Sequence, residues 1–292
     1  MSINQNIDDN NTISLSSKRT YKSIISGLSK RLAVKLESVN DLIQHMEKIL
    51  TFMENLPYNS RKTRLSALLK ILPDEYSEIK NIIRKQMLDD IKETNNKILE
   101  NKKDDKQSKN WIDWKDVLKI YTGMTPKFNK MVRDKSLDDY EKMFLRNYVI
   151  LSFFIHQEPR RSLDYVSMKL KPTKTENYID MKNNTIVFNR YKTQKVYGTQ
   201  NIPLNPSMKK ILNVYIRTLP STQEYLFIKD DKKMNSAHFT HILNGIFKKR
   251  FSVNNIRHSY LTHLYGEDFQ NMKERASRMG HNIDTALEYI KK

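Results

Sequence analysis

The stretch that decides the fold class runs from residue 177 to residue 205 and reads NYIDMKNNTIVFNRYKTQKVYGTQNIPLN. Apolar and polar side chains alternate in it with a period of about two residues, which is typical of half-buried strands. The segments 177–183, 185–191 and 199–205 predict three short strands. Asn183 and Asn184 form the first turn, and residues 192–198, KTQKVYG, form the second connection. We therefore expect a small three-stranded antiparallel sheet.

The sequence on both sides of this stretch has a helical period instead. Upstream, residues 111–121 and 137–157 predict helices, and the second is apolar enough to be buried. Downstream, helical patterns cover 206–219, 236–251 and 253–266 and continue to the end of the chain. The fold class expected for residues 111–292 is therefore mainly α with this one small sheet.

The N-terminal part of the chain predicts a separate helical domain over residues 15–100. Its helices are expected at 18–32, 38–56, 60–72 and 74–99, with Pro57 and Pro73 as breaks and Ser60 as an N-cap. Residues 1–14 are polar and rich in Asn, which predicts a disordered arm. Residues 101–110, NKKDDKQSKN, contain no apolar side chain and predict a linker between two domains.

The charge of the chain points to a polyanionic partner. Its 52 basic and 33 acidic residues give a net charge of +19. Residues 111–292 hold 32 of the basic and 18 of the acidic residues, a net charge of +14. An excess of this size favours nucleic acid as the partner, with an anionic membrane surface second.

Several classes of function are disfavoured by what the sequence lacks. It has no run of about 18 apolar residues and no signal-peptide pattern, so we expect no membrane span and no secretion. Zero cysteines exclude disulfides and a Cys nucleophile. The six glycines form no phosphate-binding loop, and His258 and His263 lack the spacing of a metal pair, so we expect no cofactor and no metal.

Three basic positions could carry chemistry. In PRRSLDYVSMKL, residues 159–170, Asp164 follows Arg161 by three residues and could orient its guanidinium, although a surface salt bridge has the same spacing. Arg257 begins an apolar helix in NNIRHSYLTHLYG, residues 254–266. Lys192 and Lys195 lie in the second connection of the sheet, where solvated lysines are also common.

Taken in order, these fragments resemble the tyrosine recombinase, or phage-type integrase, family. The resemblance matches Arg161 and Asp164 to the first arginine motif, and Lys192 in YKT to the hairpin lysine. It also matches Arg257, His258 and the following THL to the HxxRHxxxTHL box, and MGH with a late tyrosine to His281 and Tyr289. It covers residues 111–292 well. For residues 15–100 it rests only on a helical bundle that is similar in size to the family's core-binding domain.

Two departures from the family pattern stand out. The leading His of the box is replaced by Asn254, and the interval from His281 to Tyr289 is eight residues, where many bacterial members have nine. The shorter interval and the PRR…DY wording resemble versions from mobile elements and from large DNA viruses or their satellites. The replaced His leaves open a decayed, purely DNA-binding module.

The resemblance implies an enzyme that cuts and rejoins double-stranded DNA through a covalent 3′-phosphotyrosyl intermediate, without ATP or metal. It implies catalytic roles for Arg161, Lys192, Asn254, Arg257 and His281, with Tyr289 as nucleophile and Asp164 and His258 in support. Further DNA contacts are expected from the basic residues Arg160, Lys195, Lys248, Lys249 and Arg250.

The resemblance also implies an assembly and a setting for the reaction. Family members act as homotetramers on two duplexes, with a monomer or dimer off DNA, and the two domains clamp the DNA. The expected location is intracellular with access to DNA, in a host nucleus or at a viral replication site. A type IB topoisomerase uses similar chemistry, and that alternative stays open at this point.

Overall fold

The computed structural model describes residues 2–100, 102–133, 136–280, 283 and 287. Its chain forms two compact units, residues 1–102 and 103–292. Each unit has its own hydrophobic core within the described residues, one built from residues between Ile3 and Ile83 and the other from residues between Trp114 and Ile256. No helix in this part of the chain is long and apolar enough to cross a membrane.

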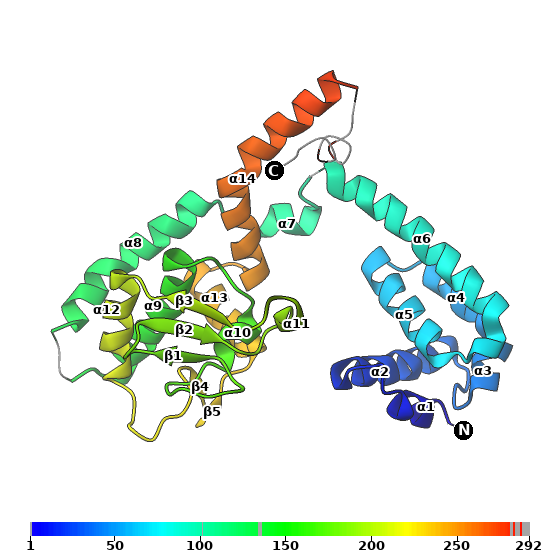
Figure 1. Ribbon diagram of the computed structural model, residues 1–292, viewed down its shortest axis with the longest axis horizontal. Helices are drawn as coiled ribbons and strands as arrows, with labels where there is room; N and C mark the ends of the chain where they lie inside the picture. Colours follow the sequence, from blue (N-terminus) through cyan, green and yellow to red (C-terminus); the bar gives the residue numbers. More distant parts are fainter. Residues whose placement is uncertain (1, 101, 134–135, 281–282, 284–286, 288–292) are drawn as a thin grey trace. The chain divides into compact units, whose positions relative to one another are not determined.

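The first unit is entirely helical in its described residues (Figure 1). Its elements are α1 (Ile3–Asp9), α2 (Leu15–Leu32), α3 (Val39–Gln44), α4 (Met46–Glu54), α5 (Tyr58–Ile71), η1 (Asp74–Tyr76) and α6 (Ser77–Glu100). Leu42, Ile49 and Met53 are buried in its core, as the helical spacing predicts.

The N-terminal segment corrects the expectation of a disordered arm. Residues 3–9 form α1, and the Ser2 hydroxyl accepts a hydrogen bond from the Gln5 amide at 3.2 Å. Ile3 and Ile7 lie one turn apart on the same face and are each only 1% exposed. The polar composition of this segment concealed two apolar residues at helical spacing, and burying them outweighs the cost of ordering so short a helix.

Two helix boundaries in the first unit also differ from expectation. The helix expected over 38–56 is divided at His45, whose backbone leaves the helical region with φ −106° and ψ 13°. The next helix starts at Tyr58 after Pro57, so Ser60 lies inside it rather than capping it. Proline just before the first helical residue already fixes the entry of the chain into the helix.

The second unit combines helices with the expected three-stranded sheet (Figure 1). Strands β1 (Tyr178–Asp180), β2 (Thr185–Phe188) and β3 (Gln200–Pro203) pair antiparallel in that order. Ile186 is opposite both Ile179 and Ile202 in the register. The turn between β1 and β2 contains Asn184 at φ 52°, a left-handed conformation that asparagine tolerates.

The helices of the second unit are α7 (Asp105–Asn110), α8 (Trp114–Met131), α9 (Asp139–His156), α10 (Ser162–Val166), α11 (Gln194–Tyr197), α12 (Pro206–Ile216), α13 (Ser236–Phe247) and α14 (Val253–Arg278). Helix α9 packs against α8, α12 and α13 and is buried continuously from Tyr148 to Phe154. A small hairpin of β4 (Ile228–Lys229) and β5 (Lys232–Lys233) lies outside the sequence prediction.

The segment expected to be a linker, residues 101–110, contains α7. Asp104 and Gln107 form a reciprocal capping box, in which the Gln107 amide donates to Asp104 Oδ1 at 2.6 Å. Capping by polar side chains supplies a helix signal that needs no apolar residue, which is why the hydrophobic pattern missed it.

Candidate functional site

A cavity of about 260 Å³ in the second unit brings distant parts of the sequence together. It is lined by residues of the α9–α10 loop, of α10, of the β2–β3 connection and of the first part of α14: Glu158, Pro159, Arg160, Arg161, Asp164, Tyr191, Thr193, Tyr197, Gln200 and Arg257. The cavity thus joins Arg161 and Arg257, which are 96 positions apart in the sequence, to the loop that carries Lys192.

Helix α10 is held in place by Tyr165, which is fully buried. Its ring packs among Phe153, Phe154, Phe188 and Phe239, with centroid distances between 5.2 and 6.4 Å. The Tyr165 hydroxyl accepts a hydrogen bond from the Arg160 amide at 3.0 Å. Because burial raises the pKa of Tyr165, this phenol stays protonated. The aromatic anchor therefore sets the position of the two arginines that precede the helix.

The partner of Asp164 corrects the sequence interpretation. Arg160, not Arg161, donates from Nε to Asp164 Oδ2 at 3.1 Å. Asp164 is 2% exposed, and its burial raises its pKa although the neighbouring Arg160 charge opposes that shift. The expected i,i+3 pair is an i,i+4 pair because Arg161 is the N-cap of α10, with extended backbone, and Arg160 lies before it.

Arg161 and Arg257 are both half-buried at this cavity. Neither side chain makes a hydrogen bond or ion pair with the residues that the structure describes. Two guanidinium groups with donors in reserve, on the same cavity, suit an oxyanion such as a phosphate group.

The β2–β3 connection places Lys192 beside the cavity. Its neighbours Tyr191 and Thr193 line the cavity, while Lys192 itself is exposed. The connection is more ordered than a plain turn, since α11 occupies residues 194–197 and carries the exposed Lys195. Figure 1 shows α11 at the end of the β2–β3 pair, next to α10. The Tyr191 hydroxyl donates to the Gly198 carbonyl at 2.8 Å and closes the loop on itself.

Asn254 and His258 line a different cavity. Helix α14 begins with a capping box between Ser252 and Asn255, and it directs Asn254 and His258 to a space of about 1010 Å³ beside α7. Arg250 lines this second cavity together with Asp104 and Asp105. The structure therefore separates Asn254 and His258 from the cavity that holds Arg257.

The two other basic residues predicted to contact DNA lie where α13 ends. Lys248 is its C-cap, with a left-handed backbone at φ 52°. Lys249 donates from Nζ to the Trp111 carbonyl at 3.0 Å. His281 and Tyr289 lie outside the described residues.

Sequence reasoning missed the residues that hold the cavity together. Asn177 is fully buried, and its amide donates to the carbonyls of Asp164 at 2.9 Å and Arg190 at 3.0 Å. Gln200 accepts from Arg160 Nη1 at 2.6 Å. Neither residue belongs to a recognisable motif, although an Asn at the start of an expected strand was a signal that its amide serves backbone groups.

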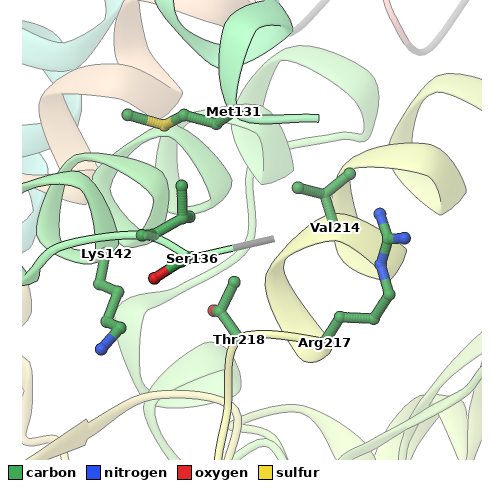
Figure 2. Close-up of a pocket in the computed structure, with 7 residues that line it drawn as sticks. Met131, Ser136, Lys142, Val214, Arg217 and Thr218 are labelled. Atoms are coloured by element: carbon green, nitrogen blue, oxygen red, sulfur yellow. The ribbon is translucent and has the colours of Figure 1, made fainter. Parts of the chain in front are cut away.

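The remaining cavities hold none of the predicted catalytic residues, with the exception of Asn254 above. One of about 400 Å³ is lined by Met131, Ser136, Leu137, Lys142, Val214, Arg217 and Thr218, and Figure 2 shows Lys142 and Arg217 on opposite sides of it. Within the described ranges, no group of three or more His, Asp or Glu side chains could hold a metal ion.

Comparison with known proteins gives little more. No family model and no curated protein matches the chain. Among solved structures, a crystal structure of XerA recombinase aligns with 99% of this chain and 93% of its own, at 11% identity and a TM-score of 0.38. A likeness at this level assigns neither family nor function, so the function proposed next rests on the residues of the site.

Proposed function

We propose that this chain is a tyrosine-type DNA recombinase that cuts and rejoins duplex DNA through a 3′-phosphotyrosyl intermediate. The observation that carries the proposal is the 260 Å³ cavity, which joins Arg161, Arg257 and the Lys192 loop. These are three of the elements that the sequence resemblance had matched to the family, and they are far apart in the chain.

The proposed roles follow from the chemistry of each group. A phenol with a pKa near 10 is a weak nucleophile at neutral pH, so the phosphodiester must be activated. Arg161 and Arg257 contact the non-bridging oxygens and stabilise the charge that develops on them. His281 is assigned to the same phosphate by the resemblance.

The proposed step conserves atoms and charge. The Tyr289 oxygen forms a bond to phosphorus as the bond from phosphorus to the 5′ oxygen breaks, and Lys192 donates its proton to that leaving oxygen. The phenol proton passes to solvent or to His281. Because the phosphotyrosine retains the energy of the broken bond, the 5′ hydroxyl of another strand can reverse the step and rejoin the DNA.

The proposal extends to the substrate and to the first unit. The net charge of +19 supports duplex DNA as the substrate. We assign residues 15–100 as the domain that clamps the duplex, and the ends of a viral or mobile element as the natural target, acted on by a homotetramer. Relaxation of supercoiled plasmid without strand exchange would instead assign a type IB topoisomerase.

Formation of a covalent adduct tests the proposal directly. The protein is incubated with nicked duplexes that bear candidate element ends, and adducts are scored on denaturing gels. We expect the natural protein to form an adduct and Tyr289→Phe to form none while still binding DNA.

The matched control is Tyr197→Phe, because Tyr197 lines the cavity and is 65% exposed, which makes it the closest rival nucleophile among the described residues. This variant should keep the adduct. Loss of the adduct in Tyr197→Phe but not in Tyr289→Phe, or peptide mapping of the DNA to Tyr197, would contradict the assignment.

A further inference from the structure

Arg160 connects two elements that the sequence does not link. Its guanidinium donates from Nε to Asp164 of α10 at 3.1 Å and from Nη1 to Gln200 of β3 at 2.6 Å. Its central carbon lies 4.0 Å from the ring centroid of Phe188 and 4.7 Å from that of Tyr191. The side chain is only 17% exposed. Four partners and this degree of burial fix the guanidinium in one orientation.

The partners of Arg160 mark the two arms of the loop that carries Lys192. Phe188 is the last residue of β2, Gln200 is the first of β3, and the two are opposite each other in the register. The chain leaves the sheet after Phe188 and returns at Gln200, so Arg160 holds both arms at the base of the loop. Tyr191, the fourth partner, immediately precedes Lys192.

The loop is rigid within itself as well as anchored at its base. The Tyr191 hydroxyl donates to the Gly198 carbonyl at 2.8 Å, and the Thr199 hydroxyl donates to Asn189 Oδ1 at 3.0 Å. A loop that is stiff internally moves as one piece about its attachment. Its attachment to α10 therefore decides where Lys192 can reach, and Arg160 and Asn177 supply that attachment.

We propose that Arg160 is a positioning residue for Lys192, which it aligns by tying the 189–199 loop to α10. This inference rests on the function proposed above. It assigns different roles to two adjacent arginines, because Arg161 keeps its donors for the substrate while Arg160 uses Nε and Nη1 within the fold. An Arg160→Lys replacement would not substitute, since an ammonium can neither make the two-sided planar contact nor stack between two rings.

The two roles can be separated with a change in the substrate. If sulfur replaces the bridging 5′ oxygen, the leaving group departs as a thiolate, whose conjugate acid has a pKa near 8.5, and no proton donor is needed. A defect in proton donation is therefore corrected on the sulfur substrate. A defect in stabilising the non-bridging oxygens persists on it.

Single-turnover cleavage is measured on matched oxygen and sulfur duplexes. We expect Lys192→Ala to be slowed by about 10²–10⁴ on oxygen and restored on sulfur. Arg160→Ala should show the same pattern with a smaller loss, about 10–10² on oxygen. Arg161→Ala should be slowed on both substrates.

Two further variants control for folding. Arg190→Ala removes an arginine of the same loop whose side chain is 71% exposed and pairs with Glu176, and it should cleave both substrates at the natural rate. Gln200→Ala removes one contact at the base of the loop and leaves the Arg160–Asp164 pair in place. It should reproduce a milder form of the Arg160→Ala pattern even if Arg160→Ala does not fold.

Two results would overturn the inference while leaving the proposed function intact. If Arg160→Ala and Gln200→Ala are slowed equally on oxygen and sulfur, Arg160 acts on the phosphate and does not position the lysine. If both variants cleave the oxygen duplex at the natural rate, the attachment has no role. Failure of the natural protein to cleave either duplex would instead reject the proposed function itself.

Discussion

At the scale of single residues, identical side chains at positions 160 and 161 meet different environments. The Arg160 guanidinium lies between two aromatic rings and donates to two side chains. The adjacent Arg161 is half-buried on the same cavity and has no such partners in the described part of the chain. The N-cap conformation of Arg161 produces the difference, since its extended backbone turns successive side chains in different directions.

The separation of Asn254 from the arginine cavity gives the first prediction at this scale. Arg161→Ala and Arg257→Ala should each slow single-turnover cleavage by about 10²–10³, because each removes a donor to the charge formed in the transition state. Their DNA affinity should fall only modestly. Asn254→Ala should slow cleavage by less than about tenfold, because Asn254 is exposed and lines the other cavity.

The comparison requires rates and affinities for all three variants in the same buffer, with Asn254→His as a further control. Equal losses of rate and affinity in the two arginine variants would show that these residues only bind DNA. A loss of 10² or more in Asn254→Ala would place that amide at the reacting phosphate. Adduct formation by Asn254→His, but not by the natural protein, would indicate a decayed binding module.

At the scale of elements, one ion pair joins α5 to α6 in the first unit. Arg61 donates from Nε to Asp90 Oδ2 at 2.7 Å, and its Nη2 also contacts the other carboxylate oxygen. The side chains are 16% and 9% exposed, and Arg61 Nη1 reaches the Glu54 carbonyl at the end of α4 at 2.9 Å. The Asp90 carboxylate raises the pKa of Arg61, so both groups stay charged at all ordinary pH values.

Removing one partner of this pair should destabilise the first unit. We expect Asp90→Ala to lower the free energy of unfolding by about 2–3 kcal/mol, since it leaves the Arg61 charge partly buried without its carboxylate. Urea unfolding followed by circular dichroism measures the change. The matched control is Asp8→Ala, which removes the exposed Lys22–Asp8 pair and should cost less than about 1 kcal/mol. Equal costs for the two variants would mean that the Arg61–Asp90 pair contributes no more than a surface contact.

At the scale of the whole molecule, the two units differ in charge as well as in fold. Residues 111–292 carry a net charge of +14 and residues 1–110 a net charge of +5. If the charge serves DNA binding, the logarithm of the binding constant should fall with the logarithm of salt concentration, by about 0.9 per phosphate neutralised.

A titration of DNA binding between low and moderate salt measures this slope. The full chain should give a steep slope, and a fragment spanning residues 103–292, which has its own core, should retain most of it. A nearly flat response would show that the charge serves solubility alone. A fragment slope below half of the full-chain value would assign the first unit the larger share of phosphate contacts.

The sequence by itself determined the elements whose signals are local. The change of period at residues 177–205 located the three strands, and helical spacing located the buried α9 and the bundle of the first unit. It failed where the signal was weak or polar, at α1, at α7 and at the division of α3 from α4. Two isoleucines, a capping box and one histidine outside the helical region decide those places, and none of them alters a hydrophobic pattern averaged over a window.

The sequence also selected Arg161, Arg257 and Lys192 as candidates, but only the tertiary structure decided which residues meet. Residues 161, 191, 193 and 257 line one cavity because the buried Tyr165 fixes α10 and Arg160 ties the β2–β3 loop to it. The tertiary structure also assigned Asp164 to Arg160 and directed Asn254 to a second cavity. Pairing of this kind depends on packing between residues far apart in the chain, and spacing along the sequence does not determine it.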